Sequence, residues 1–86
     1  MWVRSQDKNR LIETTNFKIE AKSEYNKYNQ YGTDYTKPTI RYNIVSLDNI
    51  LATYSTKEKA LKVFDMIQEN VGKAEIIFQM PQDDEV

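Results

Sequence analysis

The side chains that could do chemistry in this 86-residue chain are aromatic and basic ones. The sequence has no His and no Cys, so it lacks the usual general base at neutral pH and a thiolate nucleophile. Carboxylates such as Asp7, Glu13 and Glu20 stand where solvated strand and turn residues normally stand. The pattern therefore predicts no catalytic residue and a protein that is not an enzyme.

The sequence also gives no sign of a metal or cofactor site. The acidic run Asp83-Asp84-Glu85 lacks the glycine turn and the alternating oxygen ligands of a calcium loop. Gly32 and Gly72 are the only glycines and stand far apart, which excludes a glycine-rich phosphate loop. We expect neither a metal nor a cofactor.

A cluster of tyrosines is the most distinctive feature. Between Ser23 and Lys37 the only hydrophobic-class residues are four tyrosines, set among Asn, Gly and Thr. Tyr supplies stiff contact area with a polar tip, so a loop of this composition is typical of a recognition surface. The alternative, that the tyrosines cover the open face of a sheet, carries equal weight. The candidate binding residues of this segment and the following strand are Tyr25, Tyr28, Tyr31, Tyr35 and Tyr42.

Basic residues and one tryptophan near the N-terminus indicate a second kind of site. Together with the tyrosines they could form an aromatic and basic groove for single-stranded nucleic acid or a nucleotide. The net charge of −1 is far from the strongly basic balance of most nucleic-acid binders, and a tryptophan in a strand usually packs in a core. The residues of this alternative are Trp2, Arg4, Arg10 and Arg41, with Lys8 beside them.

Alternating side chains predict the short strands that must position these residues. Trp2 to Gln6 and Phe17 to Ala21 alternate, with Leu11-Ile12 between them, which predicts an antiparallel meander. Asp48-Asn49 is a two-residue turn signal between Thr39 to Leu47 and Ile50 to Tyr54, which predicts a hairpin. The run from Ala74 to Met80 predicts a final strand.

A helix is expected between the hairpin and the final strand. Ser55-Thr56-Lys57-Glu58 has the spacing of a capping box, and Gly72 would end the helix in a left-handed conformation. The apolar stripe runs through Ala60, Phe64, Ile67 and Val71, joined by Leu61 and Val63. With Met66, this stripe is wide enough to pack against a second copy, so a homodimer is a third alternative. The expected common core is Phe17, Ile19, Ile44, Leu61, Phe64, Ile67, Ile76 and Phe78.

These elements predict an α+β fold with one antiparallel sheet of about five strands and one helix packed on one face. The order is a β-meander, a hairpin, the helix and the final strand. Residues 1–81 would form a single domain and residues 82–86 an acidic disordered tail. No apolar run reaches the length of a signal peptide or a membrane span, and the lack of Cys fits a reducing compartment. We therefore expect a cytoplasmic protein without a membrane partner.

Three segments carry a resemblance to a known group of proteins. Trp2 to Lys8 with Leu11-Ile12-Glu13, Leu51 to Ala60, and Phe78 to Pro81 resemble segments of small uncharacterised proteins of low-GC Gram-positive bacteria and their phages. The resemblance covers both ends of the chain and not its tyrosine-rich middle, and it implies a bacterial habitat without an assigned activity. The leading hypothesis is a non-enzymatic binding module, encoded by a phage or mobile element, that docks on a host or phage protein through the region from Tyr25 to Tyr42. Inhibition of a host system is one outcome of such docking.

Overall fold

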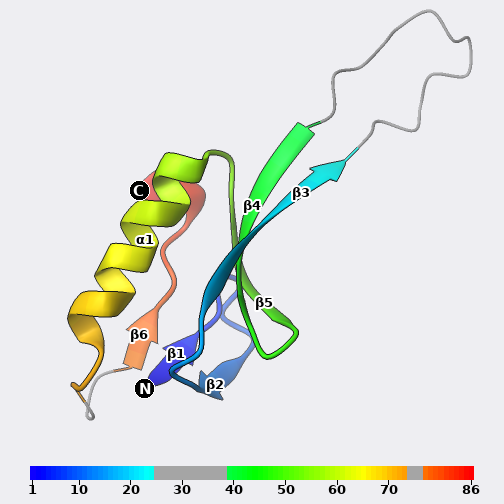
Figure 1. Cartoon of the computed structure of the whole chain (residues 1–86). Coiled ribbons are helices and arrows are strands. Elements are labelled where there is room, and N and C mark those ends of the chain that lie inside the picture. The colour runs from blue at the N-terminus through cyan, green and yellow to red at the C-terminus, as the bar shows by residue number, and fades with distance from the viewer. Residues whose placement is uncertain (25–38, 74–76) are drawn as a thin grey trace, which may run out of the picture.

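The computed structural model describes residues 1–24, 39–73 and 77–86, which form six strands, one α-helix and one 3-10 helix (Figure 1). The expected long loop from Ser23 to Lys37 falls almost wholly outside these ranges. The elements are β1 (Trp2–Arg4), β2 (Leu11–Glu13), β3 (Lys18–Glu24), β4 (Thr39–Ser46), β5 (Asn49–Tyr54), α1 (Lys57–Asn70), β6 (Ile77–Gln79) and η1 (Asp83–Glu85).

The described strands form two sheets of three strands each, in the orders β2-β1-β6 and β3-β4-β5. Strand β1 pairs antiparallel with β2 and parallel with β6, whereas β4 pairs antiparallel with both β3 and β5. The α+β class is confirmed, but the single antiparallel sheet of about five strands is wrong. The chain after β1 turns away, so that the Gln6 N–H donates to the Leu51 carbonyl at 2.8 Å, and β6 returns beside β1 from the far end of the sequence.

The β4–β5 hairpin is present, but its turn lies one residue earlier than expected. Ser46 pairs with Asn49, so the two turn residues are Leu47 and Asp48, with φ of 48° and 68°. Two positive φ values are the signature of a type I′ turn, whose twist matches that of the flanking strands. The Asn49 side chain donates to the Leu47 carbonyl at 3.1 Å, so Asn49 serves the turn from the first position of β5.

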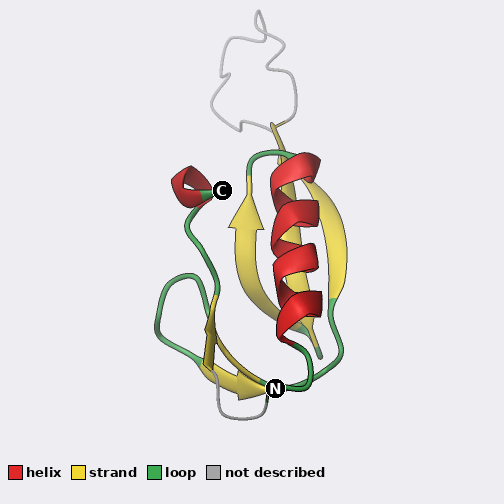
Figure 2. Cartoon of the chain, turned by 90° about the vertical axis from the view of Figure 1, so that its left-hand side faces the viewer, coloured by secondary structure: helices red, strands yellow, loops and turns green. Residues whose placement is uncertain are grey.

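Helix α1 packs against β4 and β5, and Figure 2 shows it in front of the β3-β4-β5 sheet. Its buried side chains are Ala60, Val63 and Ile67. The predicted stripe was therefore rotated: Leu61 is 46% exposed and Val71 52% exposed, and Phe64 is half-buried. The buried cluster consists of Val3, Ile44, Leu51, Ala52, Tyr54, Ala60, Val63, Ile67, Phe78 and Met80.

The remaining residues predicted for the core differ in how deeply they are buried. Ile44, Ile67 and Phe78 are buried in the cluster, while Phe17 and Ile19 are partly buried against it. Ile76 lies outside the described residues.

The N-terminal end of the helix differs from the expected capping box, whereas the C-terminal end does not. Thr56 is the N-cap, and its hydroxyl accepts from the Lys59 N–H at 3.2 Å. Ser55 instead donates from its backbone N–H to Asp83 Oδ1 at 2.8 Å. At the other end Gly72 has φ of 91°, which confirms the left-handed residue expected after the helix.

The last residues form η1 in place of the expected disordered tail. Lys59 Nζ donates to the Asp83 carbonyl at 2.8 Å, and the Tyr54 hydroxyl donates to the Pro81 carbonyl at 2.7 Å. These contacts hold the C-terminal segment beside the start of α1, where Figure 1 places the C-terminus. The acidic composition alone did not indicate that Asp83 would have partners.

In the described ranges, no helix is long and apolar enough to span a lipid bilayer.

Candidate functional site

The β2-β1-β6 sheet has one face on the core and one face in solvent. Val3 and Phe78 are buried and register-paired in β1 and β6, so their neighbours along each strand point the other way. Trp2 is 40% exposed, Leu11 51% and Ile77 56%. We call this surface the outer face; its strand residues are Trp2, Arg4, Leu11, Glu13, Ile77 and Gln79.

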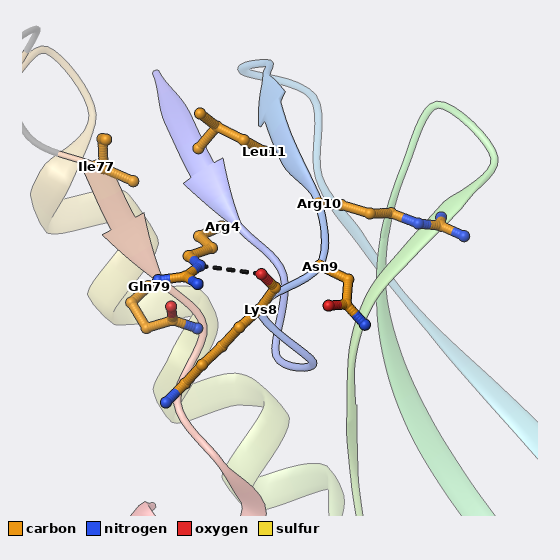
Figure 3. A pocket seen from close by; sticks show the side chains of 7 residues that line it. All are labelled: Arg4, Lys8, Asn9, Arg10, Leu11, Ile77 and Gln79. Atoms are coloured by element: carbon orange, nitrogen blue, oxygen red, sulfur yellow. Dashed lines mark hydrogen bonds between the residues drawn. The ribbon is translucent and has the colours of Figure 1, made fainter.

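A hollow of about 500 Å³ lies on this face. Figure 3 shows Leu11 of β2 and Ile77 of β6 on either side of β1, with Arg4 between them. The hollow therefore combines two aliphatic walls with basic groups. Its lining residues are Arg4, Lys8, Asn9, Arg10, Leu11, Ile77 and Gln79.

The loop between β1 and β2 brings the cations of the hollow together. The Ser5 N–H donates to the Arg10 carbonyl at 3.0 Å, and the Arg10 N–H donates to Ser5 Oγ at 3.1 Å. Lys8 has φ of 65° and donates from its backbone N–H to the Ser5 carbonyl at 2.9 Å. This tight loop places Lys8 and Arg10 in the lining of the same hollow as Arg4, although the sequence separates them by up to six positions.

Asp7 supports the loop through hydrogen bonds to its neighbours. Its carboxylate accepts hydrogen bonds from the Ser5 hydroxyl and, at 3.0 Å, from the Asn9 N–H. The Ser5 hydrogen bond, followed by that from Asn9, lowers the pKa of Asp7 below its usual value. The carboxylate is therefore ionised at neutral pH and fixed in the turn.

The two arginines of the hollow donate hydrogen bonds to uncharged oxygen atoms. Arg4 Nε donates to the Lys8 carbonyl at 3.2 Å, drawn as a dashed line in Figure 3. Arg10 Nη1 donates to Asn49 Oδ1 at 3.3 Å, and Figure 3 shows the Arg10 side chain pointing away from Arg4. Among the residues that the structure describes, no carboxylate forms an ion pair with Arg4, Lys8 or Arg10. Their charges remain available to an anionic group of a ligand.

Two glutamines tie this loop to the rest of the protein. Gln6 Nε2 donates to the carbonyls of Thr53 and Pro81, both at 3.1 Å, and Gln6 Oε1 accepts from the Thr53 N–H at 3.0 Å. Gln79 Nε2 donates to the Ser5 carbonyl at 3.0 Å. The hollow therefore lies on a scaffold braced by β5 and the C-terminal segment.

The structure brings some predicted site residues together and separates others. Trp2 and Arg4 lie on the outer face and Arg10 beside it, as one group. Arg41 is in the other sheet, five residues before Ser46 at the end of β4, or about 16 Å along the strand. Tyr42 is half-buried, paired with Tyr54 and packed against the core. The remaining candidates, Tyr25, Tyr28, Tyr31 and Tyr35, lie outside the described residues.

The sequence reasoning missed four residues of the hollow, namely Asn9, Leu11, Ile77 and Gln79. Leu11 and Asn9 could have been found, because a tight turn after β1 places them close to Arg4. Ile77 and Gln79 could not, because no local pattern shows that β6 pairs with β1. Within the described ranges, no group of three His, Cys, Asp or Glu residues is arranged to hold a metal ion.

Comparison of the chain with protein-family models, curated proteins and solved structures found no match. Function is therefore inferred from the geometry of the outer face.

Proposed function

We propose that the protein is a non-enzymatic binding module that docks on a partner protein through the outer face. One observation carries the proposal: Trp2, Leu11 and Ile77 are all at least 40% exposed on a single sheet face, next to cations that form no ion pair with a described carboxylate. Scattered exposed apolar residues are ordinary, but a group on one face is typical of an interaction site.

The residue types of this face are those that dominate protein interfaces. Trp and Arg are enriched among the few residues that contribute most of the binding free energy, and aliphatic side chains fill the contact around them. Trp2 and Arg4 both project from β1, a strand held on both sides by its neighbours. Their backbone is therefore fixed before binding, which reduces the entropy lost on association.

The charges and shape of the hollow define the partner. Its cations would bind carboxylates of the partner, and its walls of Leu11 and Ile77 would contact an apolar side chain next to those carboxylates. We therefore propose a partner surface that is both acidic and apolar. Such complementarity raises the association rate, and added salt lowers it. If the partner belongs to a host system, covering its surface would inhibit that system.

Site-specific photo-cross-linking tests this proposal. A photoreactive residue is placed at position 11 on the outer face and, as a control, at position 61 on α1, because Leu11 and Leu61 are similarly exposed, at 51% and 46%. In extract from the native host, position 11 should capture a partner that position 61 does not. Combining the position 11 probe with Arg4→Glu should abolish the capture. Equal capture from both positions, or capture that survives Arg4→Glu, would contradict the proposal.

Single-stranded nucleic acid is the second candidate, favoured by the three cations around the hollow. Trp2 is the only tryptophan, so its fluorescence reports directly on a base stacked at the outer face. Three phosphate contacts would give a slope of about −2 for the logarithm of affinity against that of salt concentration. Titration with oligo(dT) decides between the two candidates, since the docking proposal expects no binding at physiological salt.

A further inference from the structure

Strand β3 is the long open edge of the described structure. The second edge of β5 is covered by Gln6, which bonds to Leu51 and Thr53. Strands β2 and β6 have only three residues each, whereas β3 has seven. In the part of the chain that the structure describes, β3 pairs with β4 alone, and α1 packs on β4 and β5. An edge of this length presents a row of backbone groups to any strand that can pair with it.

The side chains of β3 determine which strand can pair there. Ile19 packs against the core, so Lys18, Glu20 and Lys22 share the opposite face, and all three are exposed. Their charges alternate in sign along that face. Lys18 Nζ lies 2.9 Å from Glu20 Oε1, and this hydrogen bond raises the pKa of Lys18. Protected edges commonly carry lysines that repel another strand, but alternating charges repel only in some registers.

We propose that β3 pairs antiparallel with β3 of a second copy, centred on Ala21, and joins two β3-β4-β5 sheets into one sheet of six strands. In this register Ala21 faces Ala21, and Glu20 of each copy faces Lys22 of the other. The two exposed Glu–Lys pairs are related by a twofold axis normal to the sheet, which gives a closed dimer.

Neighbouring registers are unfavourable for a definite reason. A centre at Glu20 would set Glu20 against Glu20 and Lys18 against Lys22, and a centre at Lys22 would set two Lys22 residues together. Like charges directly opposite one another destabilise a strand pair. A shift by one residue would place Ile19 on the charged face, because side chains alternate with a period of two. A centre at Ile19 would also oppose Lys18 and Glu20, but it would pair only three residues of β3. The centre at Ala21 opposes Glu20 and Lys22, keeps Ile19 off the charged face and pairs all seven residues of β3.

The test uses two charge-reversed variants and their mixture. Lys22→Glu and Glu20→Lys each create like-charge contacts in a homodimer, but a mixed dimer restores both Glu–Lys pairs. Because Glu20 and Lys22 are exposed, both variants should fold, which circular dichroism checks. Sedimentation equilibrium should show a concentration-dependent dimer for the unaltered chain. Each variant alone should dimerise at least about tenfold more weakly than the unaltered chain. An equimolar mixture of the two variants should regain the original affinity.

The control is Lys62→Glu, which makes the same change of net charge as Lys22→Glu at an exposed position of α1 and should dimerise like the unaltered chain. A monomer at all concentrations up to the millimolar range would overturn the proposal. So would variants that dimerise normally alone, or a mixture that fails to recover. The outer face takes no part in this contact, so the result is independent of the docking proposal.

Discussion

Replacing Gln6 with alanine should destabilise the protein more than its half-buried position suggests. The side chain makes three hydrogen bonds of 3.0 to 3.1 Å, to both backbone groups of Thr53 and to the Pro81 carbonyl. Each such bond contributes about 0.5–1.5 kcal/mol net. Since water can reach part of the site and rescue one bond, we expect Gln6→Ala to lower the free energy of unfolding by about 2 kcal/mol.

Urea denaturation followed by far-ultraviolet circular dichroism measures this loss. Gln68→Ala is the matched control, because Gln68 is exposed on α1 and its loss should change the free energy by less than about 0.5 kcal/mol. The urea m-value should stay the same in both variants, because the surface exposed on unfolding is unchanged. If Gln6→Ala and Gln68→Ala unfold at the same urea concentration, the bracing role assigned to Gln6 is refuted.

Three further predictions concern the C-terminal segment, the core and the hairpin. The hydrogen bond from the Ser55 backbone N–H lowers the pKa of Asp83. The ionised carboxylate therefore stabilises the fold above about pH 4, and this contribution is lost as the pH falls through the lowered pKa. In thermal melts between pH 7 and pH 2, Asp83→Asn should lose less stability than the unaltered chain, and an equal loss would contradict the Ser55–Asp83 contact. Ile67→Ala should cost about 2–5 kcal/mol, because Ile67 is only 2% exposed, whereas Leu61→Ala should cost less than about 0.5 kcal/mol. The reverse order in thermal melts would contradict the observed packing of α1. Replacing Leu47-Asp48 by Asn-Gly should stabilise the hairpin by about 1 kcal/mol, because both residues have positive φ, and a lower melting temperature would argue against the type I′ turn.

The sequence predicts best those elements whose evidence is local. The helix is recognisable from its apolar spacing and from Gly72, and the hairpin from polar residues between two apolar runs. The prediction of which helix residues are buried fails where two nearby positions are both apolar. Both Leu61 and Val63 are apolar, so spacing alone could not show that Val63 is buried and Leu61 exposed. The actual stripe became clear only from the surfaces of β4 and β5 against which α1 packs.

The division into two sheets could not be derived from periodicity. The parallel pairing of β1 with β6 joins residues about 75 positions apart in the sequence, and three-residue strands contain too few positions to specify a neighbour. The same limit applies to the candidate site. Arg4 and Arg10 are close in sequence and a tight loop connects them, whereas Ile77 lines the hollow through a strand pairing that only the fold provides.

The affinity of Trp2→Ala for the partner captured from position 11 tests the central claim most directly. Trp2 lies on the outer face and is 40% exposed, so its removal should cost at least about 2 kcal/mol, or a roughly thirtyfold weaker Kd by isothermal titration calorimetry. Ile40→Ala is the control, because Ile40 is 45% exposed in the other sheet and should leave Kd unchanged. A Trp2→Ala variant that binds within twofold of the unaltered protein would contradict the assignment of the outer face as the docking surface.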